Sequence, residues 1–409
     1  MPFDQRIRHL QESLIELGVE GAVLFHSRDV YYYTGTAQPA FLIVRPDDYF
    51  LFVINGIEFA HRDSPLPPEK IISERSLEKM SGRMFPGQGS GATVATELDL
   101  LTVGRFRELQ KVLGRREIVD VSEEILRQRM TKDEVEIDAI RRACAAVHAG
   151  HEAAMDCLRP GVTELELSAA VEYAQRLAGH DGMLFMRQPD ALIGRGPFAS
   201  GDNLQHMSGG AFCLTGTGLD PAVPVGASRR EIQRNDLVVI DVPACVNGYH
   251  SDQSRTYCPG HPPGDAVTLY KAVLQVMDHL IEQLRPGMRI GDAFSIGLDK
   301  ARELGIQDSY LRFPSGATAH FIGHGVGLDV NEPPVLKKGS EVVLQAGMTL
   351  ALEITATTTN GHPVKIEDVV LVSPDRCRIL TTTPRDQIQV PAFTTSPTDS
   401  RTCPTKKPA

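Results

Sequence analysis

Carboxylates embedded in apolar, strand-like segments constrain the fold of this chain more than any other feature. Asp241 follows the apolar run LVVI, Glu353 lies inside MTLALEITA, and Glu367 lies inside VKIEDVVLV. An ionised side chain buried among apolar neighbours is costly unless another group compensates its charge. The chain must therefore fold so that these segments bring their carboxylates to a shared partner.

Two more residues complete a set with the chemistry of a metal site. Asp252 follows Asp241 beyond the turn sequence VNGYHS, so a hairpin would place the two carboxylates side by side. His324 lies in GHGVG, where glycines let the backbone approach closely, and Glu353 and Glu367 lie on a second plausible hairpin. Carboxylates held together repel one another, and divalent cations relieve that repulsion.

Each residue of this set has a simpler interpretation when it is taken alone. One acid could be a solvated turn residue, and a lone histidine is usually a core residue with its hydrogen bonds satisfied. The five together favour two divalent metal ions over these readings. Carboxylate-rich ligation with one imidazole suits Mn, Co, Fe or Zn better than a thiolate site would.

Composition excludes several other classes of protein. The chain has 409 residues, of which 42% are hydrophobic, so two or three domains can each bury a core. The net charge of -10 argues against nucleic-acid binding, and no apolar run is long enough to span a membrane. The stretch from Met1 to Gln11 lacks an apolar signal core. The seven cysteines are scattered without a CxxC pair, which predicts no disulfide framework and a cytoplasmic protein.

The periodicity of apolar residues divides the chain into two folded parts. A helix over 5–19, a strand over 22–26 and a hairpin over 41–54 begin an alternation that predicts a small α/β domain. The segment VYYYTG is expected to lead into a turn. A long amphipathic helix then starts with Thr131 as its N-cap, and a second helix starts at the capping-box sequence Thr163–Glu166.

The predicted domains are therefore 1–128, 129–390 and a flexible tail, 391–409, rich in Thr, Ser and Pro. In the second domain, the stretch 186–230 is rich in Gly, Ser, Asn and Pro, so we expect loops and short strands around a cleft.

Several motifs resemble those of one enzyme family. The segments VVIDVPACVNGYHSDQSRTY, GHGVGLDVNEPP, GMTLALEIT and VKIEDVVLV closely resemble the pita-bread metallopeptidases, which include methionine aminopeptidase, prolidase, aminopeptidase P and creatinase. The segment GVEGAVLFHSRDVYYYTG resembles the creatinase-type N-terminal domain of prolidase and aminopeptidase P. The resemblance implies an α/β N-terminal creatinase-type domain plus an α+β pita-bread catalytic domain, assembled as a homodimer.

The resemblance also implies a role for each residue of the set. Asp241, Asp252 and Glu367 would hold one metal ion, and Asp252, Glu367, His324 and Glu353 would hold the other. Glu353 would be the general base that takes a proton from a water bridging the two ions.

The sequence departs from the family where peptide-handling groups are expected. Peptidases of the family carry a histidine in a PHG-like turn and another in a DVHE-like segment, and here Val225 and Asn331 stand in those places. Asn331 can donate a hydrogen bond to an oxyanion but cannot act as an acid. Lys365 replaces an arginine, which keeps a positive charge but loses the planar fork. His206 and His362 are candidates for the missing imidazoles, unless they are ordinary loop residues.

Three functions remain open on this basis. The first is a metal-dependent Xaa-Pro peptidase-like hydrolase of a small peptide or amide. The second is a hydrolase or lyase of a small non-peptide molecule, like the creatinase-type and sulfonium-lyase relatives. The third is a binding protein that kept the fold without catalysis, which the intact five-ligand set disfavours.

Overall fold

The computed structural model describes residues 2–87, 89–188, 194–208, 213–386 and 388–390. The chain divides into two compact units, Met1–Arg129 and Met130–Ala409. The segment 391–409, expected to be a flexible tail, lies outside the described residues.

The first unit is built around a six-stranded mixed sheet with the strand order β4-β3-β2-β1-β5-β6. The β1–β2 and β2–β3 pairs are antiparallel, and β3–β4, β1–β5 and β5–β6 are parallel. The strands are β1 (Gly21–Leu24), β2 (Ala40–Val44), β3 (Tyr49–Val53), β4 (Ile71–Ser73), β5 (Thr93–Thr96) and β6 (Glu117–Asp120). The helices are α1 (Pro2–Glu16), α2 (Ser27–Thr34), α3 (Ile57–Asp63), α4 (Leu77–Met84), α5 (Val103–Leu113) and α6 (Ser122–Met130), which reaches the unit boundary.

The structure confirms the predicted α/β pattern of this unit. The predicted strand and hairpin are present as β1 and as β2 with β3. The segment VYYYTG forms the end of helix α2 and leads into a turn, as predicted. The turn comes at Gly35, whose φ of 72° ends the helix in the left-handed conformation that glycine adopts without strain.

The second unit combines four long helices with a nine-stranded sheet. Its strands are β7 (Phe198–Ser200), β8 (Val238–Val246), β9 (Tyr249–Pro259), β10 (Phe321–Gly325), β11 (Glu332–Lys337), β12 (Thr349–Thr357), β13 (Pro363–Val372), β14 (Cys377–Ile379) and β15 (Gln389–Val390). Its helices are α7 (Glu134–Cys157), α8 (Glu164–Leu177), α9 (Gly264–Gln283) and α10 (Ile290–Glu303).

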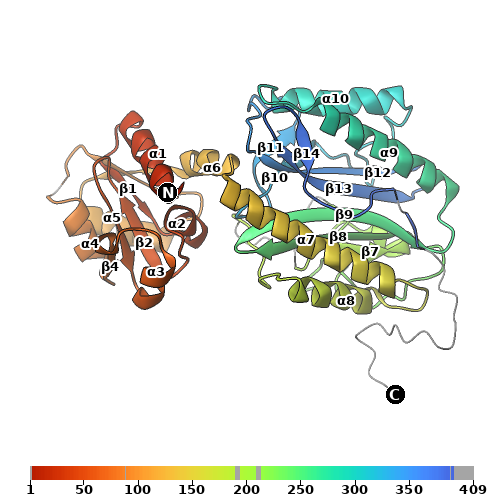
Figure 1. Cartoon of the computed structure of the whole chain (residues 1–409), viewed down its shortest axis with the longest axis horizontal. Helices are drawn as coiled ribbons and strands as arrows, with labels where there is room; N and C mark the ends of the chain where they lie inside the picture. Colours follow the sequence, from red (N-terminus) through yellow and green to blue (C-terminus); the bar gives the residue numbers. More distant parts are fainter. Residues whose placement is uncertain (1, 88, 189–193, 209–212, 387, 391–409) are drawn as a thin grey trace, which may run out of the picture. The chain divides into compact units, whose positions relative to one another are not determined.

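The sheet of this unit has the order β11-β10-β12-β13-β9-β8-β7, with β14 on β13 and β15 on β9. Helix α7 packs against β8 and β9, α8 packs against α7 and β7, and α9 packs against β12 and β13 (Figure 1). Every second residue of the central strands enters these helical layers, for example Ile240 toward α7 and α8, and Ile354 and Ile366 toward α9 and α10. The alternate residues of the same strands must therefore face the opposite side of the sheet.

The two predicted helix starts have different outcomes. Helix α8 begins at Thr163, whose hydroxyl accepts the N–H of Glu166 in a capping box, as predicted. Helix α7 is capped by Asp133 instead of Thr131, because Asp133 accepts from the backbone of Val135 and Glu136 and Glu136 reciprocates. Thr131 is instead bridged to Met348.

Within the described ranges, no helix has both the length and the apolar character needed to cross a membrane.

Candidate metal centre

Strand register places four residues in one row across the sheet. Glu353 on β12 lies opposite Glu367 on β13, Glu367 lies opposite Ser254 on β9, and Ser254 lies opposite Asp241 on β8. Directly opposed residues of antiparallel strands project from the same face. That face is the one turned away from the helices, so the three predicted acids of this row share it.

The remaining predicted ligands, Asp252 and His324, are each displaced from this row by two residues along the strand direction, which keeps them on the same face. Asp252 precedes Ser254 by two positions on β9. The β8–β9 hairpin that brings it there closes at Asn247 and Gly248, with φ values of 54° and 79°, the pattern of a type I′ turn. His324 on β10 lies opposite Ala351, two positions before Glu353.

Glycines flanking His324 fit the predicted close approach of backbone. A Cβ at Gly325 would clash with the carbonyl oxygen of Pro333 on the neighbouring strand. The imidazole Nδ1 lies 3.0 Å from the carbonyl oxygen of Gly325, which can only accept, so Nδ1 carries the proton. The unprotonated Nε2 is thereby turned toward the carboxylates, as in a ligand oriented by its second nitrogen.

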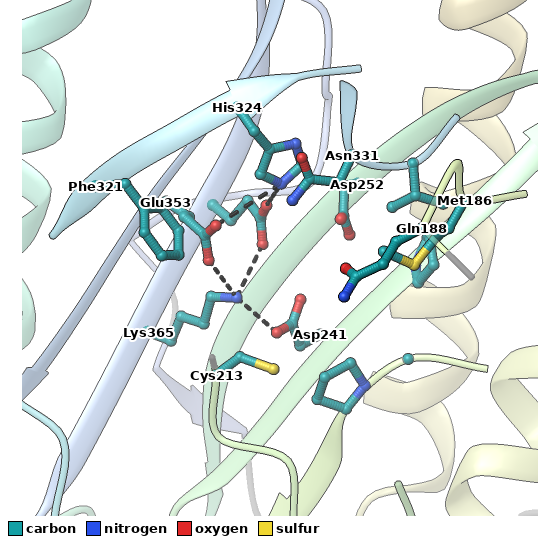
Figure 2. Close-up of a pocket in the computed structure, with 15 residues that line it drawn as sticks. Met186, Gln188, Cys213, Asp241, Asp252, Phe321, His324, Asn331, Glu353 and Lys365 are labelled. Atoms are coloured by element: carbon teal, nitrogen blue, oxygen red, sulfur yellow. Dashed lines mark hydrogen bonds and ion pairs between the residues drawn. The ribbon is translucent and has the colours of Figure 1, made fainter. Parts of the chain in front are cut away.

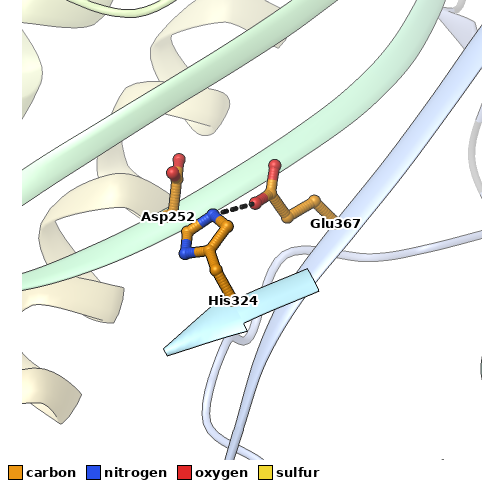
Figure 3. Close-up of side chains that lie close together, drawn as sticks. All are labelled: Asp252, His324 and Glu367. Carbon is orange, nitrogen blue, oxygen red and sulfur yellow. Dashed lines mark ion pairs between the residues drawn. The ribbon is translucent and has the colours of Figure 1, made fainter. Parts of the chain in front are cut away.

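Three of the five predicted ligands converge closely enough to share one ion. Donor atoms of Asp252, His324 and Glu367 all lie within 4.8 Å of one another (Figure 3). Nε2 of His324 is 3.7 Å from Oε1 of Glu353 and 3.9 Å from Oε1 of Glu367. Four of the five predicted ligands therefore lie close together, and Asp241 makes an ion pair with a further residue.

That partner is Lys365, whose ammonium lies among the acids (Figure 2). Its Nζ is 2.6 Å from Oδ2 of Asp241, 2.9 Å from Oε2 of Glu353 and 3.2 Å from Oε2 of Glu367. Lys365 precedes Glu367 by two residues on β13, so it shares the face of the row. The sequence marked this lysine only as a replacement for arginine, and its position on the strand was the signal for its contact with the acids.

The acids differ in how their surroundings affect ionisation. Burial and the charge of Asp241 raise the pKa of Asp252 well above its usual range, and burial and the charge of Asp252 do the same to Glu367. Burial also raises the pKa of Asp241, despite its contact with Lys365. Burial raises the pKa of Glu353 too, but the charge of Lys365 and its hydrogen bond outweigh burial and leave the pKa below its ordinary value. Without a bound metal ion, the centre therefore favours the protonated forms of Asp252 and Glu367.

One buried oxygen supports the fit of a cation here. Among the described residues, Oγ of Ser254 is buried without a hydrogen-bond partner, while Oε2 of Glu367 has the Lys365 ammonium 3.2 Å away. Both residues belong to the row described above. A buried, unpaired oxygen beside repelling carboxylates is an environment that a divalent cation, with its water ligands, would satisfy. The donor set of carboxylates and one imidazole therefore fits a divalent ion at Asp252, His324 and Glu367.

A small cavity of about 250 Å³ opens onto the centre (Figure 2). All five predicted ligands and Lys365 line it, together with Asn331, as expected for a substrate-contacting residue. Other lining residues were not singled out from the sequence, namely Met186, Gln188, Gly196, Pro197, Cys213, Pro243, Phe321 and Val330. Five of these eight come from the stretch 186–230, which was predicted only as loops around a cleft. Burial raises the pKa of the Cys213 thiol well above its usual value.

The two candidate histidines are not among the residues that line this cavity. His206 is exposed and follows the short 3-10 helix Gly201–Gln205. His362 lies in the turn between β12 and β13, where its Nδ1 is 3.0 Å from Oδ1 of Asp265 at the start of α9. Val225 is buried, with 6% of its surface exposed, and is also absent from the cavity lining. Neither His206 nor His362 therefore lies where its predicted catalytic role would require it.

Comparisons with known proteins identify both units. The model of metallopeptidase family M24 matches residues 138–374, and the creatinase/prolidase N-terminal domain matches residues 6–131. The chain is 30% identical over 386 residues to a Xaa-Pro dipeptidase of Pyrococcus furiosus, covering 93% of this chain and 99% of the relative. It is 30% identical over 303 residues to the probable dipeptidase PepE of Mycobacterium tuberculosis, covering 74% and 72%.

Solved structures agree with this assignment. The prolidase from Pyrococcus furiosus superposes with a TM-score of 0.74 at 26% identity, covering 92% of this chain and 100% of that one. A Xaa-Pro dipeptidase from Bacillus anthracis shows the same fold, with a TM-score of 0.78 at 22% identity, covering 95% and 99%. The family implies divalent metal ions, and the donor set of the centre described above fits such an ion. The chain belongs to metallopeptidase family M24, with a creatinase/prolidase-type N-terminal domain and a pita-bread catalytic domain, and it is a metallohydrolase resembling the Xaa-Pro peptidases.

Proposed function

We propose that this protein hydrolyses a dipeptide or a similarly small amide, with Xaa-Pro dipeptides as the first candidates. The observation that carries the proposal is the convergence of Asp252, His324 and Glu367 beside a cavity of only about 250 Å³. The name of the Pyrococcus furiosus relative, a Xaa-Pro dipeptidase, supplies the candidate substrate. A cavity of this size suits a small molecule better than an extended peptide chain.

The residues of the centre can be assigned to metal ions. Asp252, His324, Glu353 and Glu367 would hold a divalent ion, and the family resemblance gives Asp241 a place in the site of a second ion. A divalent ion bound there supplies Lewis acidity, which polarises a carbonyl and makes water a better nucleophile at neutral pH. Mn, Co, Fe and Zn are the ions that this donor set favours.

Glu353 is the residue that we assign to proton transfer. Its side chain lines the cavity and is 13% exposed, more than the 1% of Glu367, so a water in the cavity can reach it. The charge of Lys365 favours its ionised carboxylate by lowering its pKa. An ionised carboxylate within hydrogen-bond reach of the attacking water is what a general base requires.

Asn331 and the cavity walls would position the substrate. The Asn331 amide can donate a hydrogen bond to the substrate carbonyl as negative charge develops on its oxygen. Met186, Phe321 and Val330 supply apolar surface, which suits a proline ring or another compact apolar group. His206 and His362 have no place in this arrangement.

A second candidate is metal-dependent chemistry on a small non-peptide substrate. The observation in its favour is that Asn331 lines the cavity at the position where the resemblance places a histidine of the peptidases. An amide can orient a substrate there but cannot donate a proton to a leaving amine. The third possibility, a protein without catalysis, is set aside because the chain is a metallohydrolase of this family.

We also propose a homodimer in the cytoplasm. The homodimer rests on the family resemblance. The reducing compartment is supported by the cysteines at 144, 157, 213, 245, 258 and 377, all of which are free thiols. Light scattering of the purified protein, and fractionation of cells that express it, test these two points.

The function is tested by incubating Mn- or Co-loaded protein with a panel of Xaa-Pro dipeptides and tripeptides. Glu353→Gln and chelator-treated protein serve as controls. Cleavage that is lost in both controls would establish the peptidase. No cleavage by protein that retains its metal would shift the assignment to the non-peptide substrate.

A further inference from the structure

The ammonium of Lys365 lies where a metal ion would have to be coordinated. It contacts Asp241, Glu353 and Glu367 at 2.6, 2.9 and 3.2 Å, and only 2% of the residue is exposed. Its backbone is fixed from both sides by Thr256, whose hydroxyl accepts the Lys365 N–H at 2.8 Å and donates to the Lys365 carbonyl at 2.9 Å. The lysine is therefore a fixed, buried residue of the centre.

The lysine affects the two proposed metal sites to different extents. Asp252, His324 and Glu367 converge within 4.8 Å, and Lys365 makes no ion pair with Asp252 or His324 among the contacts of the described residues. The other site would need Asp241 together with Asp252 and Glu367. Asp241 is the acid closest to the ammonium, so its carboxylate is already engaged by a cation.

A metal ion and the ammonium cannot share that place. Carboxylate oxygens bind such ions at about 2.0–2.2 Å, well inside the separation of the lysine nitrogen from the same oxygens. An ion at Asp241 would also stand within a few ångströms of a positive charge in a buried site, where repulsion is poorly screened. The ammonium on Oδ2 of Asp241 therefore weakens the binding of an ion to this carboxylate.

We propose that Lys365 acts as a resident cation in place of one metal ion, so that the protein binds one divalent ion tightly and a second only weakly. The tight site is formed by Asp252, His324, Glu353 and Glu367, and Asp241 is held by the lysine. This inference rests on the proposed metal-dependent hydrolysis but concerns the number of ions in the centre. It makes the catalytic site a mononuclear one that uses an ammonium to balance the extra carboxylate.

The test is the stoichiometry of Mn²⁺ on the full-length chain after chelator treatment and dialysis. Titration calorimetry together with elemental analysis should give one tightly bound ion in the natural protein. Lys365→Met removes the charge while keeping an unbranched chain, and it should bind two. Lys300→Met, which removes a partly exposed lysine on α10, should still bind one and serves as the matched control.

Electron paramagnetic resonance of the natural protein tests the same point without any variant. With two equivalents of Mn²⁺ added, the signal should be the six-line spectrum of isolated ions. An exchange-coupled pair, or two equally tight ions by calorimetry, would overturn the inference while leaving the hydrolase assignment intact. A single bound ion in Lys365→Met of normal circular dichroism would overturn it as well. One bound ion with no hydrolysis of any peptide would instead count against the proposed function.

Discussion

Removing the buried lysine of the pair Lys132–Glu332 should destabilise the catalytic unit far more than removing a lysine from a partly exposed pair. Nζ of Lys132 lies 2.8 Å from Oε1 of Glu332, and the two side chains are 1% and 2% exposed. Lys132→Met would leave the Glu332 carboxylate buried without this ammonium. Breaking one half of such a pair costs about 3–5 kcal/mol, because a desolvated charge loses its compensation.

The pair Lys300–Glu303 on α10 provides the matched control. Its N–O separation is 2.7 Å, nearly the same, but its side chains are 19% and 67% exposed. Lys300→Met should therefore change stability by less than about 1 kcal/mol. The double variant Lys132→Met with Glu332→Gln should recover about 2 kcal/mol relative to Lys132→Met, since neither member of the pair then carries a charge.

The assay is urea unfolding of metal-free protein, followed by far-ultraviolet circular dichroism. The chain has two compact units, so the transition of residues 130–409 must be separated from that of the first unit. Equal destabilisation by Lys132→Met and Lys300→Met would refute the reasoning that burial, and not bond length, sets the size of the effect. A double variant as unstable as Lys132→Met would refute it too.

Three further predictions concern the centre and its surroundings. Glu353→Gln should lower turnover at saturating Mn²⁺ by about 10²–10⁴-fold, because an amide cannot accept the proton, and a loss below tenfold in steady-state kinetics would rule out a general base. Gly325→Ala should weaken Mn²⁺ binding by about 10–100-fold in calorimetry, because a clash with the Pro333 carbonyl displaces the strand that carries His324, and unchanged affinity would contradict this. Burial lowers the pKa of His151 to about 3, so the unfolded chain binds a proton below pH 6.5 that the folded chain does not. Stability should therefore fall by about 1 kcal/mol per pH unit from pH 6.5 toward 3, and His151→Gln should show a smaller slope in urea unfolding measured across this range.

The sequence predicted the gathering of the four acids because each lies in or beside a segment with a strand or hairpin signal. Two hairpins and a period of two are enough to place Asp241 near Asp252 and Glu353 near Glu367. The contact of Lys365 with Asp241 could not be predicted in this way. It depends on β13, β9 and β8 lying next to one another, which is a property of the sheet order and not of any single segment.

Local rules predicted the start of α8 but not that of α7, and they were insufficient in loops. The sequence placed the cap of α7 at Thr131, whereas the structure uses Asp133. Both residues have a glutamate three positions later, so the capping-box pattern could not choose between them. His206 and His362 were predicted only because the family's two histidines are absent and these residues could replace them. Residue type carries no information on direction, and His362 is turned to Asp265 in a hairpin turn, several residue pairs from Glu353.

The sheet and the loops that border the cavity are free to change at different rates in evolution. Asp241, Asp252, Glu353 and Glu367 come from long central strands, where inserting or deleting one residue would turn every later side chain to the other face. Met186, Gln188 and Cys213 come from connecting segments, which tolerate changes of length and sequence. Relatives of this protein can therefore acquire new substrates by altering the cavity wall while inheriting the same inorganic centre.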